Sequence, residues 1–142
     1  MANHFSKLAR ESRKDVSKIK ISKSPDQSTS LEIYKLGNQI LRKKAERISK
    51  VDDSIRTLSR EMLQSMYASK GIGLAAPQIG IHKELLVIDI NFEDSAAEPL
   101  ILINPEITSY GSTLNSYEEG CLSIPGVYLN VIRPSTIKLN YR

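Results

Sequence analysis

The stretch DDSIRTLSREMLQSMYASKG, residues 52 to 71, decides the fold. Asp52 and Asp53 stand just before an apolar pattern with helical spacing, at the place where a short acidic side chain caps the free N–H groups of a first turn. Gly71 follows the pattern and predicts its end, because glycine commonly closes a helix. We therefore expect an amphipathic helix whose apolar stripe, methionines included, belongs to a core: Ile55, Leu58, Met62, Leu63 and Met66.

Four β-rich apolar runs follow this helix. KELLVIDI, LILINPEI, VYLNVIRP and STIKLNYR cover residues 83–90, 100–107, 127–134 and 135–142. One helix followed by several strands is typical of an α+β domain. The sequence thus predicts mixed or antiparallel strands packed with an N-terminal helix.

Length and charge divide the chain into two parts. Its 142 residues fit one ordinary domain, expected over residues 31–142. Residues 1–30 are polar and rich in turn formers, which predicts a mobile basic N-terminal extension with one short helix near Phe5 to Leu8. The first 50 residues hold 13 Lys and Arg against 5 Asp and Glu, a charge that would suit RNA or a ribosome surface, although no specific nucleic-acid motif accompanies it.

Apolar runs and cysteine content limit the cellular setting. No apolar run reaches the roughly 20 residues of a membrane-spanning helix, so we expect no membrane partner. The single cysteine excludes an intrachain disulfide, and no apolar secretory segment begins the chain, so we expect a reducing compartment, the cytoplasm. A plastid is the alternative, because the first 30 residues are rich in Ser, Lys and Arg.

Directly after the predicted helix stands GIGLAAPQIG, residues 71–80. Its glycines and alanines leave the backbone open to close approach by a ligand. Gln78 adds a side chain that both donates and accepts hydrogen bonds. By itself, the stretch also fits a tight connection from a helix to a strand, and it lacks the Lys-Ser/Thr ending of a phosphate loop.

The only cysteine stands in YEEGCLSIPG, residues 117–126. A lone cysteine is commonly a small buried hydrophobic residue. Two stretches together favour a different role: GIGLAAPQ at 71–78 and EGCLS at 119–123 resemble the first two signature motifs of the peptide deformylases, in matching order and at a plausible separation. The resemblance covers about residues 31–142.

This resemblance implies a metal-dependent hydrolase that removes the formyl group from the N-terminal methionine of nascent polypeptides, so N-formyl-methionyl peptides would be its substrates. The metal is typically Fe(II), with Zn or Ni as substitutes. By resemblance, Cys121 is a metal ligand that binds as thiolate. The Gln78 amide and the backbone N–H of Leu122 are, also by resemblance, the hydrogen-bond donors to the oxygen on which negative charge develops.

The resemblance also assigns residues to substrate binding. Gly73 would let the substrate backbone pair with the loop, and Ile72 would contribute to the wall of the methionine pocket. Glu119 would meet Arg133 in a buried ion pair near the site, with a surface position for Arg133 as the alternative.

A third family motif, His-Glu-x-x-His on a helix, does not occur in this sequence. In the family it supplies two histidine ligands and the glutamate that acts as general base. The two histidines present are His4, followed by FSKL, and His82, followed by KELL. A catalytic site of this type needs three protein ligands, so we expect the chain as given to retain metal poorly and to be inactive. A surface position suits His82 better than a role as second ligand.

The sequence stops inside the alternating pattern of residues 135–142, which predicts a C-terminally truncated deformylase whose fold lacks the central helix of the third motif. Without that helix, we expect the apolar faces of the strands to lack a cover. The residues concerned are Leu86, Ile88, Ile101, Ile103, Ile137 and Leu139.

Three hypotheses for function remain. The first is a truncated peptide deformylase whose longer form is the enzyme. The second is a non-catalytic, deformylase-like peptide-binding module, associated with the ribosome through its basic N-terminal part. The third makes Cys121 a nucleophile, but such an enzyme needs a histidine as its base, and none is identified. The presence of Cys121 favours the first, because a binding module has no need of the thiol.

Overall fold

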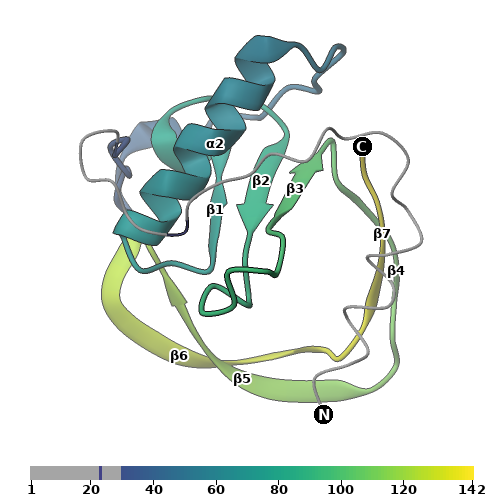
Figure 1. Ribbon diagram of the computed structural model, residues 1–142. Coiled ribbons are helices and arrows are strands. Elements are labelled where there is room, and N and C mark those ends of the chain that lie inside the picture. The colour runs from purple at the N-terminus through teal and green to yellow at the C-terminus, as the bar shows by residue number, and fades with distance from the viewer. Residues whose placement is uncertain (1–22, 24–29) are drawn as a thin grey trace.

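The computed structural model describes residue 23 and residues 30–142. The helix predicted near Phe5 to Leu8 lies outside the described residues, and the division of the chain at residue 31 stays a prediction. Helix α2, Asp53–Ala68, packs across one face of a three-stranded antiparallel sheet, as Figure 1 shows. In the described part of the chain, no helix is long and apolar enough to cross a membrane.

Helix α2 confirms the prediction made from residues 52–71. Asp52 is its N-cap, and the Asp52 carboxylate accepts two backbone N–H groups of the first turn, at 3.0 and 3.2 Å. The helix ends before Gly71, because Lys70, at φ 56°, takes the left-handed conformation instead. The N–H of Gly71 then donates to the carbonyl of Met66 at 2.9 Å, which closes the helix in a Schellman motif.

The core lies between α2 and the sheet. The sheet has the order β1-β2-β3, with β1 at Gly73–Ala75, β2 at Leu85–Ile88 and β3 at Leu100–Ile103. The helix stripe is buried except for the half-buried Leu58, and alternate β2 side chains face it. Burying each large apolar side chain is worth about 1.5 to 3 kcal/mol. The enclosed residues include Met62, Leu63, Met66, Leu85 and Val87.

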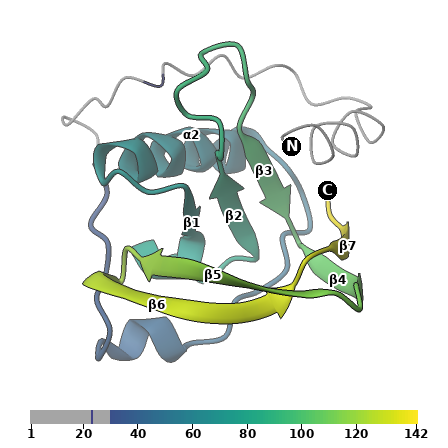
Figure 2. The ribbon, with the colours of Figure 1, turned by 90° about the horizontal axis from the view of Figure 1, so that it is seen from below.

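Two further antiparallel pairs extend from this sheet. Strand β4, Glu106–Tyr110, pairs with β7, Ile137–Asn140, and the long β5, Leu114–Cys121, pairs with β6, Ile124–Pro134. Figures 1 and 2 show the β5–β6 ribbon curving away below the sheet, with β4 and β7 at one end of it. Short 3-10 helices occupy Gln39–Arg42 (η2) and Ala76–Ile79 (η3). The α+β prediction is confirmed, and every pairing of named strands is antiparallel.

Several predicted strand boundaries were wrong. The run 100–107 forms two strands, because Asn104 adopts φ 50° ahead of Pro105 and turns the chain between β3 and β4. The Asn104 side chain fixes this turn through hydrogen bonds of 2.7 and 2.8 Å with the backbone of Ile48. Strands β1 and β5 were not predicted, since one is a short Gly/Ala segment and the other is polar.

Uncovered apolar side chains are most numerous on β5–β6, and only part of the set expected to lack a cover does so. Ile103 is only 6% exposed, because it joins the core under α2. Of the other five residues expected to lack a cover, Ile137 is exposed and the rest are half-buried. The ribbon instead curves beyond the reach of α2 and exposes a set of large apolar side chains: Leu114, Tyr117, Val127, Tyr128, Leu129 and Ile132.

The β5–β6 ribbon also carries an ion pair. The Glu119 carboxylate accepts hydrogen bonds from two nitrogens of the Arg133 guanidinium, Nε and Nη2, the second at 2.7 Å. The predicted pair is thus formed, but it is partly open to solvent rather than buried. The hydrogen bonds and the charge of Arg133 lower the pKa of Glu119 below its ordinary value.

We predict that the isolated chain self-associates through the exposed apolar side chains of β5–β6, because unpartnered apolar strand surface favours association. Ile132→Lys should shift the chain toward the monomer in size-exclusion chromatography. Leu36→Lys is the matched control, because Leu36 is equally exposed but lies outside the ribbon. A wild-type chain that elutes as a monomer and melts in one sharp transition would contradict the prediction.

We predict that Arg133→Met raises the pKa of Glu119 toward the ordinary glutamate value. A carboxyl group whose folded pKa is lowered contributes stability above its unfolded pKa and loses that contribution as pH falls through the folded pKa. The difference in stability between wild type and Arg133→Met should therefore shrink as pH falls below about 4.3. NMR titration of the Glu119 carboxyl tests this, and an unchanged pKa in the variant would show that Arg133 does not stabilise the charge.

Candidate active site

The two sequence motifs meet at the Gln78 side chain. Gln78 lies on η3, directly after β1, and its Nε2 is 3.0 Å from the Ser123 hydroxyl oxygen and 3.9 Å from the Cys121 sulfur. Cys121 ends β5, and Leu122 and Ser123 form the turn into β6. The fold thus brings an amide and a thiol 43 positions apart in the sequence into one place.

The orientation of the Gln78 amide is fixed from both ends. Its Oε1 accepts the backbone N–H of Ala75 at 2.9 Å, so the nitrogen is the end that faces the turn. The Ser123 hydroxyl is buried and accepts one proton of that nitrogen. The second proton of the amide points toward the exposed sulfur of Cys121, which is only a weak acceptor. A donor is therefore held at a defined position beside the thiol.

The turn between β5 and β6 exposes Cys121. The interpretation of this lone cysteine as a buried hydrophobic residue is therefore wrong. No acceptor for the backbone N–H of Leu122 is found among residues 30–142. The Leu122 carbonyl, in contrast, accepts the Lys35 ammonium at 2.9 Å. The turn thus holds a free thiol and a free backbone donor in adjacent residues.

The two glycines of the first motif have different roles. A Cβ on Gly71 would lie 2.6 Å from Cδ1 of Leu122, so Gly71 is required for the Leu122 side chain to pack against the core. This packing contact brings the first motif against the second. A Cβ on Gly73 would make only ordinary contact, 3.6 Å from the Val87 carbonyl oxygen. Gly73 therefore leaves room for a ligand to approach the backbone, whereas the need for glycine at position 71 comes from its contact with Leu122.

A third segment, residues 34–36, joins both motifs. The backbone N–H of Tyr34 donates to the Gln78 carbonyl, and that of Leu36 donates to the Ser123 carbonyl, each at 2.8 Å. The Lys35 ammonium also donates to the turn, through its hydrogen bond with the Leu122 carbonyl. Sequence reasoning missed this segment, because nothing in its composition points to a site, and it missed Ser123 as the partner of Gln78 although the quoted motif contains it.

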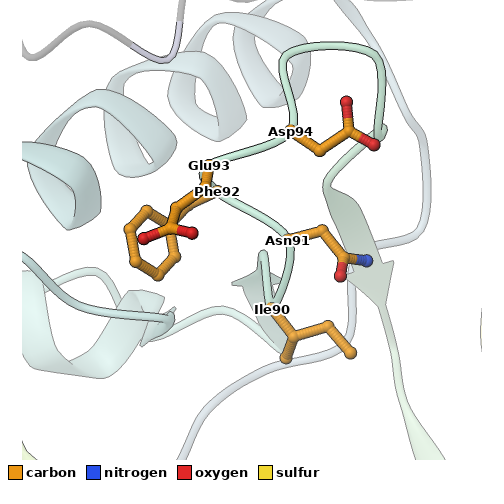
Figure 3. A pocket seen from close by; sticks show the side chains of 5 residues that line it. All are labelled: Ile90, Asn91, Phe92, Glu93 and Asp94. Atoms are coloured by element: carbon orange, nitrogen blue, oxygen red, sulfur yellow. The ribbon is translucent and has the colours of Figure 1, made fainter. Parts of the chain in front are cut away.

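The remaining predicted residues lie at the margins of this arrangement. Glu119 is near the end of β5 and holds Arg133, while Ile72 stands just before β1 with 57% of its surface exposed. A shallow hollow of about 380 Å³ lies over the β2–β3 connection, lined by residues 90–94 and by neither Gln78 nor Cys121 (Figure 3).

Cys121 is the one side chain of this described arrangement that is suited to bind a metal ion. Within the described residues, no three His, Cys, Asp or Glu side chains come close enough to hold a metal ion. The His82 Nε2 lies 3.1 Å from the Ile40 carbonyl oxygen, and His82 is half-buried rather than fully at the surface. His4 lies outside the described part. The thiol of Cys121 suits Fe(II) or Zn as one ligand, but these residues alone do not form a metal site.

Comparison with known proteins finds relatives that match the whole length of this chain. The family model described as polypeptide deformylase matches residues 30–142. Peptide deformylases of Prochlorococcus marinus strains MIT 9312 and NATL1A are 74% and 58% identical over 142 residues, which span 71% and 70% of those relatives.

Solved structures agree with this assignment. The crystal structure of a peptide deformylase from Synechococcus elongatus in complex with actinonin matches at 48% identity with a TM-score of 0.85, covering 89% of this chain and 68% of that one. A peptide deformylase from Thermotoga maritima matches at 34% identity with a TM-score of 0.73, covering 80% and 74%. The chain belongs to the polypeptide deformylase family.

Proposed function

We propose that this chain provides the formyl-binding part of a peptide deformylase, which hydrolyses the formamide bond of N-formyl-methionyl peptides. The observation that carries the proposal is the orientation of the Gln78 amide, whose nitrogen is turned toward Cys121 by the Ala75 N–H and the Ser123 hydroxyl. The sequence contains no His-Glu-x-x-His motif, so the chain as given lacks a general base and two ligands. Catalysis therefore requires residues from outside these 142.

The two donors beside the thiol would act on the formyl oxygen. Attack on the formyl carbon places negative charge on that oxygen, and donors fixed in advance stabilise the charge without reorganising. Gln78 Nε2 and the Leu122 N–H are such donors, since the first is held from both ends and the second has no acceptor among residues 30–142. Removing one donor of this type costs about 3 to 4 kcal/mol of transition-state stabilisation.

Substrate binding would use the free edge of β1. Strand β1 pairs only with β2 among the described strands, so the backbone of Gly73 can form hydrogen bonds with an extended peptide. Ile72 is exposed beside it and would form one wall of the methionine pocket. Glu119 would be held near the substrate by its ion pair with Arg133.

Cys121 is the residue we propose as the metal ligand in this chain. Fe(II) is the metal expected for the family, with Zn or Ni as substitutes, and the two other ligands would come from outside this sequence. The exposed thiol is free to take part, because the described residues give it no stronger partner than the distant Gln78 amide. We propose the cytoplasm as the compartment and the ribosome as a further contact.

We predict no deformylase activity for the chain as given. Formyl-Met peptides incubated with it and with Fe(II), Ni or Zn should release no formate above a Cys121→Ala control, because the base and two ligands are missing. Turnover that depends on Cys121 would contradict this and would require a base within these 142 residues.

A fused chain tests the roles of the two motif residues. We would join to Arg142 the part of the Prochlorococcus marinus MIT 9312 relative that continues beyond the matched region. In this fusion, Gln78→Ala should leave the metal bound and lower kcat by about 100- to 1000-fold, whereas Cys121→Ala should abolish metal retention. Metal content by mass spectrometry and formate release are the two measurements.

Gln39→Ala is the matched control, because Gln39 is an exposed glutamine on η2 and belongs to neither motif. It should change neither measurement. Equal metal loss in the Gln78 and Cys121 variants would show that the donor role of Gln78 is wrong. A fusion that binds metal and formyl peptide without turnover would favour the peptide-binding module.

A further inference from the structure

The Lys23 ammonium lies in a site made of three oxygens. Its Nζ is 2.8 Å from Oδ2 of Asp89, 2.9 Å from the Asn91 carbonyl oxygen and 2.8 Å from the Asp94 carbonyl oxygen. An ammonium has three donors and no acceptor, so all three of its protons are used. The side chains of Lys23 and Asp89 are only 11% and 2% exposed, whereas the other lysines described within the first 50 residues, at 35, 43, 44 and 50, are exposed.

The Asp89 carboxylate is built into the domain independently of Lys23. The hydroxyl of Tyr67, on α2, donates to its Oδ2 at 2.7 Å, and the Asn91 N–H donates to its Oδ1 at 2.9 Å. Burial by itself raises the pKa of Asp89, but the bonds from Lys23, Tyr67 and Asn91 outweigh this effect and lower it. The group is thus a buried anion, and a buried anion needs a cation beside it.

The two carbonyl ligands come from the β2–β3 connection, which is folded around the ammonium position. The Asp94 N–H donates to the Asn91 carbonyl at 3.0 Å, and the Asp94 carboxylate accepts the Ala96 N–H at 2.8 Å. In Figure 3 the side chains of Asn91 and Asp94 extend to one side of the connection and those of Phe92 and Glu93 to the other. The carbonyls rather than the side chains of Asn91 and Asp94 therefore serve Lys23.

We propose that Asp89, supported by Tyr67, and the carbonyls of Asn91 and Asp94 form a binding site for a primary ammonium group, which Lys23 fills from within the chain. The bound ammonium acts as a clamp that holds Lys23 on the β2–β3 connection. A guanidinium is planar and presents its donors in a fork, so it does not match three converging oxygens. Lys23 thus serves a contact within the molecule, and this role is independent of deformylase activity.

The ammonium site is connected to the first motif by a backbone hydrogen bond. The N–H of Asp89 donates to the Ile72 carbonyl at 2.9 Å, and the two strands pair directly after it, with Gly73 opposite Ile88. The ammonium therefore fixes the end of β2 that borders Ile72. Without a cation at this position, Asp89 would be left buried with an uncompensated charge, and the connection would lose three hydrogen bonds at once.

Hydrogen exchange on the full 142-residue chain tests the clamp. Lys23→Met keeps the length of the side chain and removes its charge and donors, so amides of residues 91–97 should exchange about tenfold faster or more. Lys44→Met is the matched control, because Lys44 is an exposed lysine of the same basic part. It should leave these amides unchanged. Equal exchange in the wild type and Lys23→Met would overturn the proposal.

Chemical rescue tests the ligand class. In Lys23→Ala, added n-propylammonium replaces the missing end of the side chain and should restore slow exchange at residues 91–97. Tetramethylammonium and potassium at the same concentration should not, because neither can donate three hydrogen bonds. The double variant Lys23→Ala with Asp89→Asn should not be rescued by n-propylammonium. Equal rescue by all three cations, or rescue of the double variant, would overturn the assignment of an ammonium site.

Discussion

The burial of the apolar stripe of α2 against β1, β2 and β3 is the interaction on which the rest of the molecule depends. Met62, Leu63 and Met66 are fully enclosed by it, as is Val87 from the sheet. Because β1 is only three residues long, packing rather than its own length holds it in the sheet. Gln78 follows β1 by three positions, so the place of the amide is determined by how the helix covers the sheet.

The segments that carry Gln78 and Cys121 are held together by local bonds around this core. The Leu122 side chain reaches the core over Gly71, and residues 34–36 connect the backbones of Gln78 and Ser123. Each bond involves a different segment, so no single stretch of sequence forms the site. This explains why the amide orientation, which the bonds to Ala75 and Ser123 determine, is well defined although the thiol beside it is open to solvent.

The described residues contain only some of the groups that a deformylase site needs. The chain supplies a thiol, two donors and a free strand edge, and its described residues hold no group of metal ligands. The β5–β6 ribbon, whose large apolar side chains are exposed, extends from the turn that carries Cys121 and the Leu122 N–H. The ammonium contact at Asp89 gives Lys23, one of the basic residues of the N-terminal part, a structural role that total charge could not have indicated.

The sequence by itself determined the helix, because capping and apolar spacing are local signals, and Asp52 and the stripe of α2 agree with them. It also determined the family, because the two motifs are contiguous runs of residues. Only the tertiary structure decided which strands exist and which residues meet. Strand β5 is polar and β1 is short, so neither has a local signal, and both form through pairing with a partner. The contacts of Gln78 with Ser123 and of Lys23 with Asp89 join residues 45 and 66 positions apart, and a contact of that kind depends on the packing that brings the segments together.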